Sequence, residues 1–157
     1  MLRSGLRLVV FAAGTWLLLA VPSYAQTTYG LRAGFAADPD QFVVGGHIET
    51  PGLTQSGHLT LRPSVEIGIG DEVTTVAGNM DVVYWVRIPS SEWSMYFGGG
   101  PSFNIVHDDL AGNDVHGGAN SVVGFQMTNG VFVELRGGGG AGPAGLKVMA
   151  GYVFNKK

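Results

Sequence analysis

The residues whose side chains could best take part in catalysis lie in a polar segment in the second half of the chain. His107 and His116 bound a run that also holds three aspartates, and Ser102 and Ser121 flank it. Acyl transfer requires a base held against a hydroxyl nucleophile and oriented by a further polar group. The residue types are present, but their spacing identifies no site. We therefore interpret 107–117 as a solvated polar loop and assign no catalytic residue.

Two other stretches invite an ion-binding interpretation. The DDLAGND run lacks the regular oxygen-ligand spacing and the final Glu of an EF-hand, and GGGGAGPAG lacks the Gly-Lys-Ser/Thr of a phosphate-binding loop. We therefore predict no metal site and no cofactor. Cation bridging by acidic loops stays open as an alternative, because one set of predicted loops holds seven acids and no base. These acids are Asp38, Asp40, Asp71, Glu72, Asp108, Asp109 and Asp114.

Strict alternation of apolar and polar residues dominates the rest of the chain. In His58–Gly70, every second residue from Leu59 to Ile69 is apolar, whereas the other parity carries Arg62, Glu66, hydroxyls and glycines. Side chains alternate across a strand, so this stretch has one apolar face and one polar face. A strand of this length is long for a globular protein and suits a tilted crossing of a bilayer.

The same pattern recurs in seven other segments, without a helical period between them. Asn129-Gly130 is a strong hairpin signal because both residues tolerate positive φ. An even number of antiparallel strands can close into an up-and-down barrel, and at eight strands side chains fill the interior. The predicted strands are Thr28–Ala36, Phe42–Thr50, His58–Gly70, Val76–Ile88, Trp93–Val106, Gly118–Thr128, Val131–Gly137 and Leu146–Phe154.

The first residues have the pattern of an export signal. Arg3 and Arg7 precede an apolar run, Leu8–Ala20, and Ser23-Tyr24-Ala25 has the small residues of a cleavage site. We predict a signal peptide over 1–25 and a barrel domain over 26–157. Without the signal peptide, seven bases face twelve acids, which argues against nucleic-acid binding. The chain has no cysteine and therefore no disulfide framework.

The charges of the polar parity indicate which face is enclosed. Five bases nearly balance four acids, and an enclosed lumen requires such a balance because an unpaired buried charge is costly. His47 and Trp85 share this parity, and we expect a hydrogen-bonded interior histidine and a tryptophan that plugs the lumen. The predicted network consists of Arg32, Arg62, Arg87, Arg136 and Lys147 with Glu49, Glu66, Asp81 and Glu134.

At this level the chain resembles the small eight-stranded outer-membrane barrels of the OmpA/OmpX type. The resemblance covers Thr28–Phe154 in pattern, and the last strand, KVMAGYVF, looks like the C-terminal assembly signal of such proteins. Lys147 supplies its polar residue, and Tyr152 and Phe154 supply its paired hydrophobics. The chain departs from the signal at Met149, where glycine is expected, and continues through residues 155–157.

The resemblance implies an all-β transmembrane barrel in the bacterial outer membrane, with outer-membrane lipids and the assembly machinery as partners. We expect a monomer with a structural or surface role and no enzymatic activity. The first alternative is a soluble periplasmic, lipocalin-like barrel, whose apolar parity would line a cavity for a lipophilic ligand. The second is a barrel enzyme that modifies lipid A, which requires His107 or His116 close to Ser or Asp at the outer rim.

Overall fold

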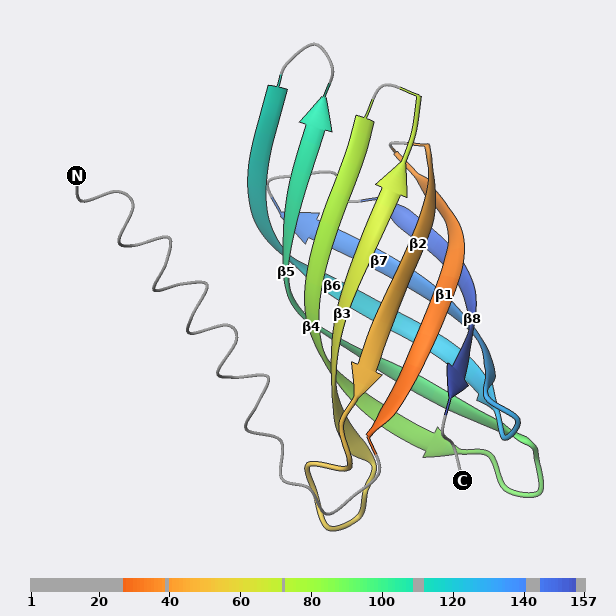
Figure 1. Ribbon diagram of the computed structural model, residues 1–157. Coiled ribbons are helices and arrows are strands. Elements are labelled where there is room, and N and C mark those ends of the chain that lie inside the picture. Colours follow the sequence, from red (N-terminus) through yellow and green to blue (C-terminus); the bar gives the residue numbers. More distant parts are fainter. Residues whose placement is uncertain (1–26, 39, 72, 109–111, 141–144, 155–157) are drawn as a thin grey trace.

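The computed structural model describes residues 27–38, 40–71, 73–108, 112–140 and 145–154. Eight strands close into a barrel in chain order, each antiparallel to its neighbours, and β1 also pairs with β8 (Figure 1). The strands are β1 (Thr28–Ala37), β2 (Gln41–Glu49), β3 (Leu59–Ile69), β4 (Val73–Arg87), β5 (Trp93–Asp108), β6 (Gly112–Met127), β7 (Val131–Gly140) and β8 (Leu146–Phe154). The predicted signal peptide and residues 155–157 lie outside the described residues.

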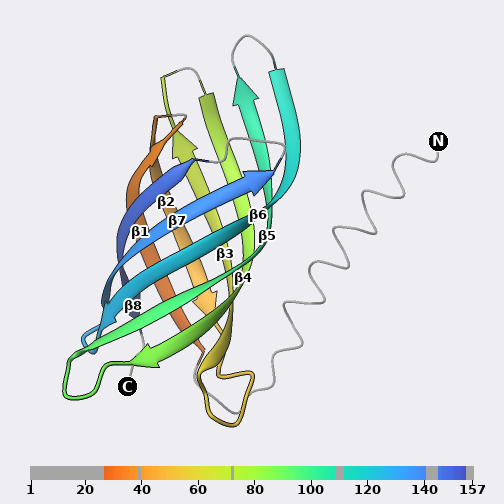
Figure 2. The ribbon, with the colours of Figure 1, turned by 180° about the vertical axis from the view of Figure 1, so that it is seen from behind.

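The barrel has two distinct ends, seen from opposite sides in Figures 1 and 2. We call one of them the terminal end, because β1 begins and β8 ends there. The β2–β3, β4–β5 and β6–β7 connections lie at the same end. At the loop end lie the other four connections. The predicted turn at Asn129-Gly130 joins β6 to β7, with Gly130 at φ 98° and its N–H donated to the carbonyl of Met127 at 3.0 Å. Only glycine adopts such a φ readily.

The strands agree with the predicted ones in number and order, but the β5–β6 hairpin is longer than predicted. β5 extends to Asp108 and β6 begins at Gly112, with pairing from Trp93↔Met127 to Asp108↔Gly112. The prediction of a polar loop over 107–117 is therefore wrong for most of that segment. Residues 112–117 show no clear alternation, but their pairing with β5 satisfies their backbone groups.

The two parities of the strands have opposite environments. Large apolar side chains occupy the outward parity and are exposed, as for Phe35 at 69% and Val148 at 60%. The inward parity is polar and buried, with Arg62 at 1% and Asp81 at 0% exposure. This arrangement is the reverse of a soluble barrel. The described residues contain no helix long and apolar enough to cross a membrane.

Apolar side chains also fill the interior toward both ends. Val83, Tyr96 and Val122 form one cluster, against which Trp85 packs. A Cβ at Gly124 would lie 2.3 Å from Cζ of Tyr96, so glycine is required there to admit the ring. A second cluster consists of Ala36, Val43 and Met149. Between these clusters the interior is occupied by charged side chains.

Candidate functional site: an ion-pair network across the barrel interior

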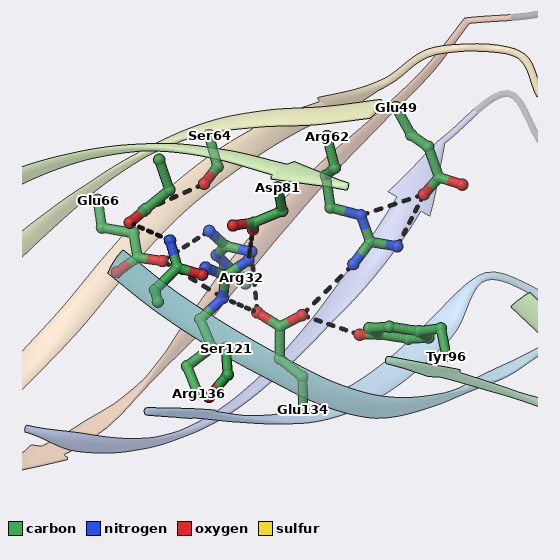
Figure 3. Close-up of polar contacts among 12 residues, drawn as sticks. Arg32, Glu49, Arg62, Ser64, Glu66, Asp81, Tyr96, Ser121, Glu134 and Arg136 are labelled. Carbon is green, nitrogen blue, oxygen red and sulfur yellow. Dashed lines mark hydrogen bonds and ion pairs between the residues drawn. The ribbon is translucent and has the colours of Figure 1, made fainter. Parts of the chain in front are cut away.

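The carboxylate of Glu134 on β7 is the hub of the interior charges (Figure 3). Its Oε1 accepts hydrogen bonds from Nη1 of Arg32 at 2.8 Å and from Nε of Arg136 at 3.0 Å. Its Oε2 accepts a bond from the hydroxyl of Tyr96 at 2.8 Å and lies 3.6 Å from Nη1 of Arg62. One buried carboxylate thus faces three guanidinium groups and a phenol.

Glu66 on β3 forms a second centre of negative charge. Its Oε1 accepts a bond from Nη2 of Arg32 at 2.6 Å and lies 3.7 Å from Nε of Arg136. Its Oε2 accepts a bond from Nζ of Lys147 at 2.7 Å. Arg136 also donates through Nη2 to the carboxylate of Asp81 on β4. Arg32 and Arg136 therefore each link Glu66 to Glu134.

Arg62 extends the network toward the terminal end. It donates from Nη2 and Nε to the same oxygen of Glu49, Oε2, at 2.7 and 3.2 Å. Its guanidinium carbon lies 4.4 Å from the ring centroid of Tyr96 and 5.5 Å from that of Trp85. Such contacts with aromatic faces stabilise a cation that has been removed from water.

The network is continuous and electrically balanced. Among the described residues of the barrel interior, each ion pair joins one of four bases to one of four acids, and all eight residues are connected. They come from β1, β2, β3, β4, β7 and β8, and Tyr96 adds β5. Burial of charge is costly unless the charges are paired and hydrogen bonded, which is the condition met here. The bases are Arg32, Arg62, Arg136 and Lys147, and the acids are Glu49, Glu66, Asp81 and Glu134.

The structure brings together eight of the nine residues predicted for this network and leaves out Arg87. This residue is the last of β4, at the terminal end, and its side chain is exposed. The parity of Arg87 is that of the interior, but parity does not report where along the strand the lumen becomes open. Its inclusion in the predicted network is therefore corrected. Without Arg87, the network has four bases and four acids, whereas five bases were predicted.

His47 also differs from the prediction of a hydrogen-bonded interior group. Its side chain is buried, and neither ring nitrogen has a hydrogen-bond partner among the described residues. The ring instead packs edge-on against Phe132, with centroids 5.5 Å apart and planes at 71°. A Cβ at Gly30 would lie 2.2 Å from Cε1 of His47, so the imidazole lies directly over this glycine.

Sequence reasoning named His47 and Trp85 but missed other uncharged side chains, which form hydrogen bonds in the interior. Tyr96 joins the network through its hydroxyl, and its parity on β5 was the available signal. Nearer the loop end, Nδ2 of Asn120 donates to Oδ1 of Asn79 at 3.0 Å, and Nδ2 of Asn79 donates to Oγ of Ser64 at 3.3 Å. These amides and hydroxyls continue the polar interior without adding charge.

The residues considered for acyl transfer are divided between the two faces of the β5–β6 hairpin. His107 and Ser121 occupy the outward parity, whereas His116 and Ser102 occupy the inward parity of the β5–β6 hairpin. Within the described ranges, no hydrogen bond joins His116 to Ser102 or to Asp114. The same ranges hold no cluster of three or more His, Asp or Glu residues that could bind a metal ion. Asp109 lies outside the described residues.

Comparisons with known proteins identify the architecture. No family model and no curated protein matches the chain. The N-terminal β-barrel domain of Pseudomonas aeruginosa OprF is similar in structure, with a TM-score of 0.61 and 18% identity, over 82% of this chain and 96% of that one. Neisserial surface protein A (NspA) has a TM-score of 0.61 and 13% identity, over 81% of this chain and 94% of that one. The fold is that of the small eight-stranded outer-membrane barrels.

Proposed function

We propose that this chain is a bacterial outer-membrane protein whose barrel spans the lipid bilayer and whose lumen is closed by the ion-pair network. One observation carries the proposal: exposed apolar side chains occupy the outward parity of the strands, while connected ion pairs occupy the inward parity. In water, this distribution would expose the apolar surface and bury the charge. In a bilayer the apolar surface contacts lipid, and a closed sheet satisfies its backbone internally.

The outward aromatic side chains support a membrane position. Aromatic residues concentrate at the two interfaces of transmembrane barrels, where their rings meet the headgroups. Tyr152 and Phe154 pack edge-on near the terminal end, with centroids 5.2 Å apart. Phe35 and Phe42 pack in the same manner near the loop end, at 5.5 Å. Two aromatic girdles at opposite ends of an apolar belt are the expected arrangement.

The closed lumen supports a structural or surface role in the cell envelope, without enzymatic activity. A pore for large solutes would require an open passage, but Arg32, Glu66, Glu134 and Arg136 meet across the interior. The soluble lipocalin-like alternative requires an apolar cavity for its ligand. In this barrel the apolar parity faces outward, and the interior holds ion pairs instead.

The last strand supports recognition by the outer-membrane assembly machinery. Tyr152 and Phe154 lie on the outward face of β8, at 45% and 44% exposure, where they are accessible to a partner. Lys147 has a structural role in the finished barrel through its ion pair with Glu66. We assign Tyr152 and Phe154 to assembly, and Lys147 both to assembly and to the lumen. The protein acts as a monomer in this proposal, with outer-membrane lipids around it.

Cell fractionation combined with gel mobility tests the proposal. We expect recovery in the outer-membrane fraction and faster migration of the unboiled protein, because a closed membrane barrel resists detergent until it is heated. In planar bilayers we expect no large, stable ion conductance of the kind that a pore for large solutes would give. A soluble periplasmic protein without a heat-dependent shift would contradict the membrane assignment. A large stable conductance would contradict the closed lumen.

A further inference from the structure

The β5–β6 hairpin extends beyond the end of β7 at the loop end of the barrel (Figures 1 and 2). β6 pairs with β5 from Gly112 onward, but its pairing with β7 begins only at Gly118↔Gly140. Among the described residues, the β7 side of 112–117 therefore has no paired strand. We name this side of 112–117 the free edge. β5, in contrast, is paired with β4 up to its last residue, Asp108.

The free edge carries backbone groups that an added strand could bond. A strand turns the N–H and C=O of every second residue to each side, so half of these groups in 112–117 face away from β5. An exposed edge is a template for a further strand, and natural edges are commonly protected by Lys, Pro or a bulge. The sequence of 112–117, GNDVHG, contains neither Lys nor Pro, and its pairing with β5 is continuous. The edge is therefore regular and open to pairing.

An apolar pair lies beside the free edge. Val115 and Ile105 are directly opposite each other on the outward face of the hairpin, at 71% and 41% exposure. From Trp93 to Phe103, which are both on the outward parity of β5, a strand tilted by about 40° rises about 25 Å, the height of the apolar band of such barrels. Ile105 and Val115 therefore lie beyond this band, where lipid tails do not cover them. This step rests on the membrane position proposed above.

The surroundings of the free edge are acidic. Asp114 is exposed on the edge itself, and Asp38, Asp40 and Asp71 are exposed in the connections at the same end. Lys147, near the start of β8, is turned into the barrel, where it forms an ion pair. A surface with charges of one sign attracts partners of the opposite sign and repels those of the same sign. These charges therefore favour a basic partner.

From these observations we propose that the free edge binds an extended, basic segment of a partner protein, which adds to the sheet as a further strand next to β6. Main-chain hydrogen bonds give such a complex its affinity, and alternate side chains give it specificity. Val115 lies on one face of the edge, and Asp114 and His116 lie on the other. The matching segment alternates apolar residues, which extend the apolar pair, with Lys or Arg, which face Asp114. This inference goes beyond the structural role proposed above, because it assigns the chain a binding partner.

A labelled peptide tests the pairing. A chain that starts at Gln26 is placed in phosphatidylcholine nanodiscs, and a fluorescein-labelled peptide of alternating lysine and valine is titrated against it and against empty nanodiscs. Two further peptides carry N-methyl groups, one on the lysine amides and the other on the valine amides. Because an added strand turns alternate amides toward its neighbour, we expect one methylated peptide to bind as the unmethylated one does. The other should bind at least about tenfold more weakly.

Two variants locate the charge contact. Asp114→Asn removes the negative charge on the free edge, and we expect the affinity for the lysine–valine peptide to fall about threefold. Asp71→Asn removes an exposed acid of the β3–β4 connection at the same end of the barrel and is the matched control. The control chain should bind the peptide as the parent chain does. Heat-dependent gel mobility verifies that each barrel is closed.

Disulfide formation locates the peptide on the hairpin. The chain has no cysteine, so Val115→Cys and Ile105→Cys each introduce a unique thiol at the same height. The peptide carries cysteine in place of its central valine. Directly opposite residues of paired strands have Cβ atoms close enough for a disulfide, whereas a residue one strand further away does not. We expect the Val115→Cys chain to form the mixed disulfide and the Ile105→Cys chain to form little of it under the same oxidising conditions.

Several outcomes would overturn the proposal. Absence of saturable binding, or equal binding of the two methylated peptides, would exclude strand addition. Equal weakening by Asp114→Asn and Asp71→Asn, or equal disulfide formation by the two cysteine chains, would exclude the free edge as the site. A disulfide between two Val115→Cys barrels, in preference to one with the peptide, would assign the edge to a second copy. Any of these results with a closed barrel in the outer membrane would contradict the partner and leave the proposed function intact.

Discussion

Nη1 of Arg32 on β1 lies 2.8 Å from Oε1 of Glu134 on β7, across the interior of the barrel. The two residues are 102 positions apart in the sequence, and β8 lies between their strands. Arg32 also reaches Glu66 on β3 through its other terminal nitrogen. One guanidinium group therefore joins three strands that have no backbone hydrogen bonds with one another. The side chains of the lumen, and not only the sheet, hold the barrel in its closed form.

We expect Glu134→Gln to destabilise the barrel by about 3–5 kcal/mol, because it leaves buried cations without their shared carboxylate. Equilibrium unfolding in urea, followed by gel mobility in lipid vesicles, measures this loss. Glu92→Gln is the matched control, since Glu92 is exposed in the β4–β5 connection. A loss for Glu134→Gln no larger than that for Glu92→Gln would contradict the role of Glu134 as hub.

The position of Arg87 outside the network leads to a second prediction. Arg87→Ala should change the free energy of unfolding by less than about 0.5 kcal/mol, as is usual for an exposed position. Arg62→Ala should cost about 3 kcal/mol, because it breaks the pair with Glu49 inside the barrel. The same urea titration compares the two. Equal losses would show that Arg87 belongs with the lumen charges after all.

A third prediction concerns the contact between Gly30 and His47. Gly30→Ala should destabilise the barrel by about 1–3 kcal/mol, because the new methyl group would lie 2.2 Å from the imidazole. His47→Ala in the same chain should recover part of this loss. Gly117→Ala is the control, since a Cβ there has no atom within 4 Å. Additive effects of Gly30→Ala and His47→Ala would rule out the steric explanation.

Much of this structure could be predicted from the sequence because a barrel repeats one local rule. Each strand places alternate residues on alternate faces, so the positions of Arg62 and Glu66 in the strand predict that their side chains share the inward face. This prediction needs no knowledge of their ion-pair partners. The number and order of strands followed from turn signals such as Asn129-Gly130. Local patterns of this kind require no knowledge of contacts between distant segments.

The remaining features depend on distance along the strand and on partners from other strands, which alternation does not encode. Arg87 has the interior parity but lies at the open end of β4. Gly112–Gly117 joined the sheet because β5 supplied its pairing partners. The imidazole of His47 packs against the ring of Phe132, whereas a hydrogen-bonding partner was expected. Each difference arises from tertiary context that a single strand does not contain.

The outward orientation of the apolar parity is the central claim, and neighbouring residues on β4 test it directly. Tyr84 is on the outward parity, at 43% exposure, whereas Trp85 points inward and packs against Tyr96. Two chains that start at Gln26, and therefore lack Trp16, each keep a single tryptophan and are compared in vesicles with brominated lipid tails, which quench tryptophan by contact. One carries Trp93→Phe, and the other carries Tyr84→Trp, Trp85→Phe and Trp93→Phe.

We expect strong quenching in the chain with Tyr84→Trp and weak quenching in the chain that retains Trp85, although the two positions are adjacent in the same strand. This result would place lipid against the apolar parity at that depth. Stronger quenching of the chain that retains Trp85, or equal quenching in both chains, would contradict the assignment of the faces and with it the proposed membrane barrel.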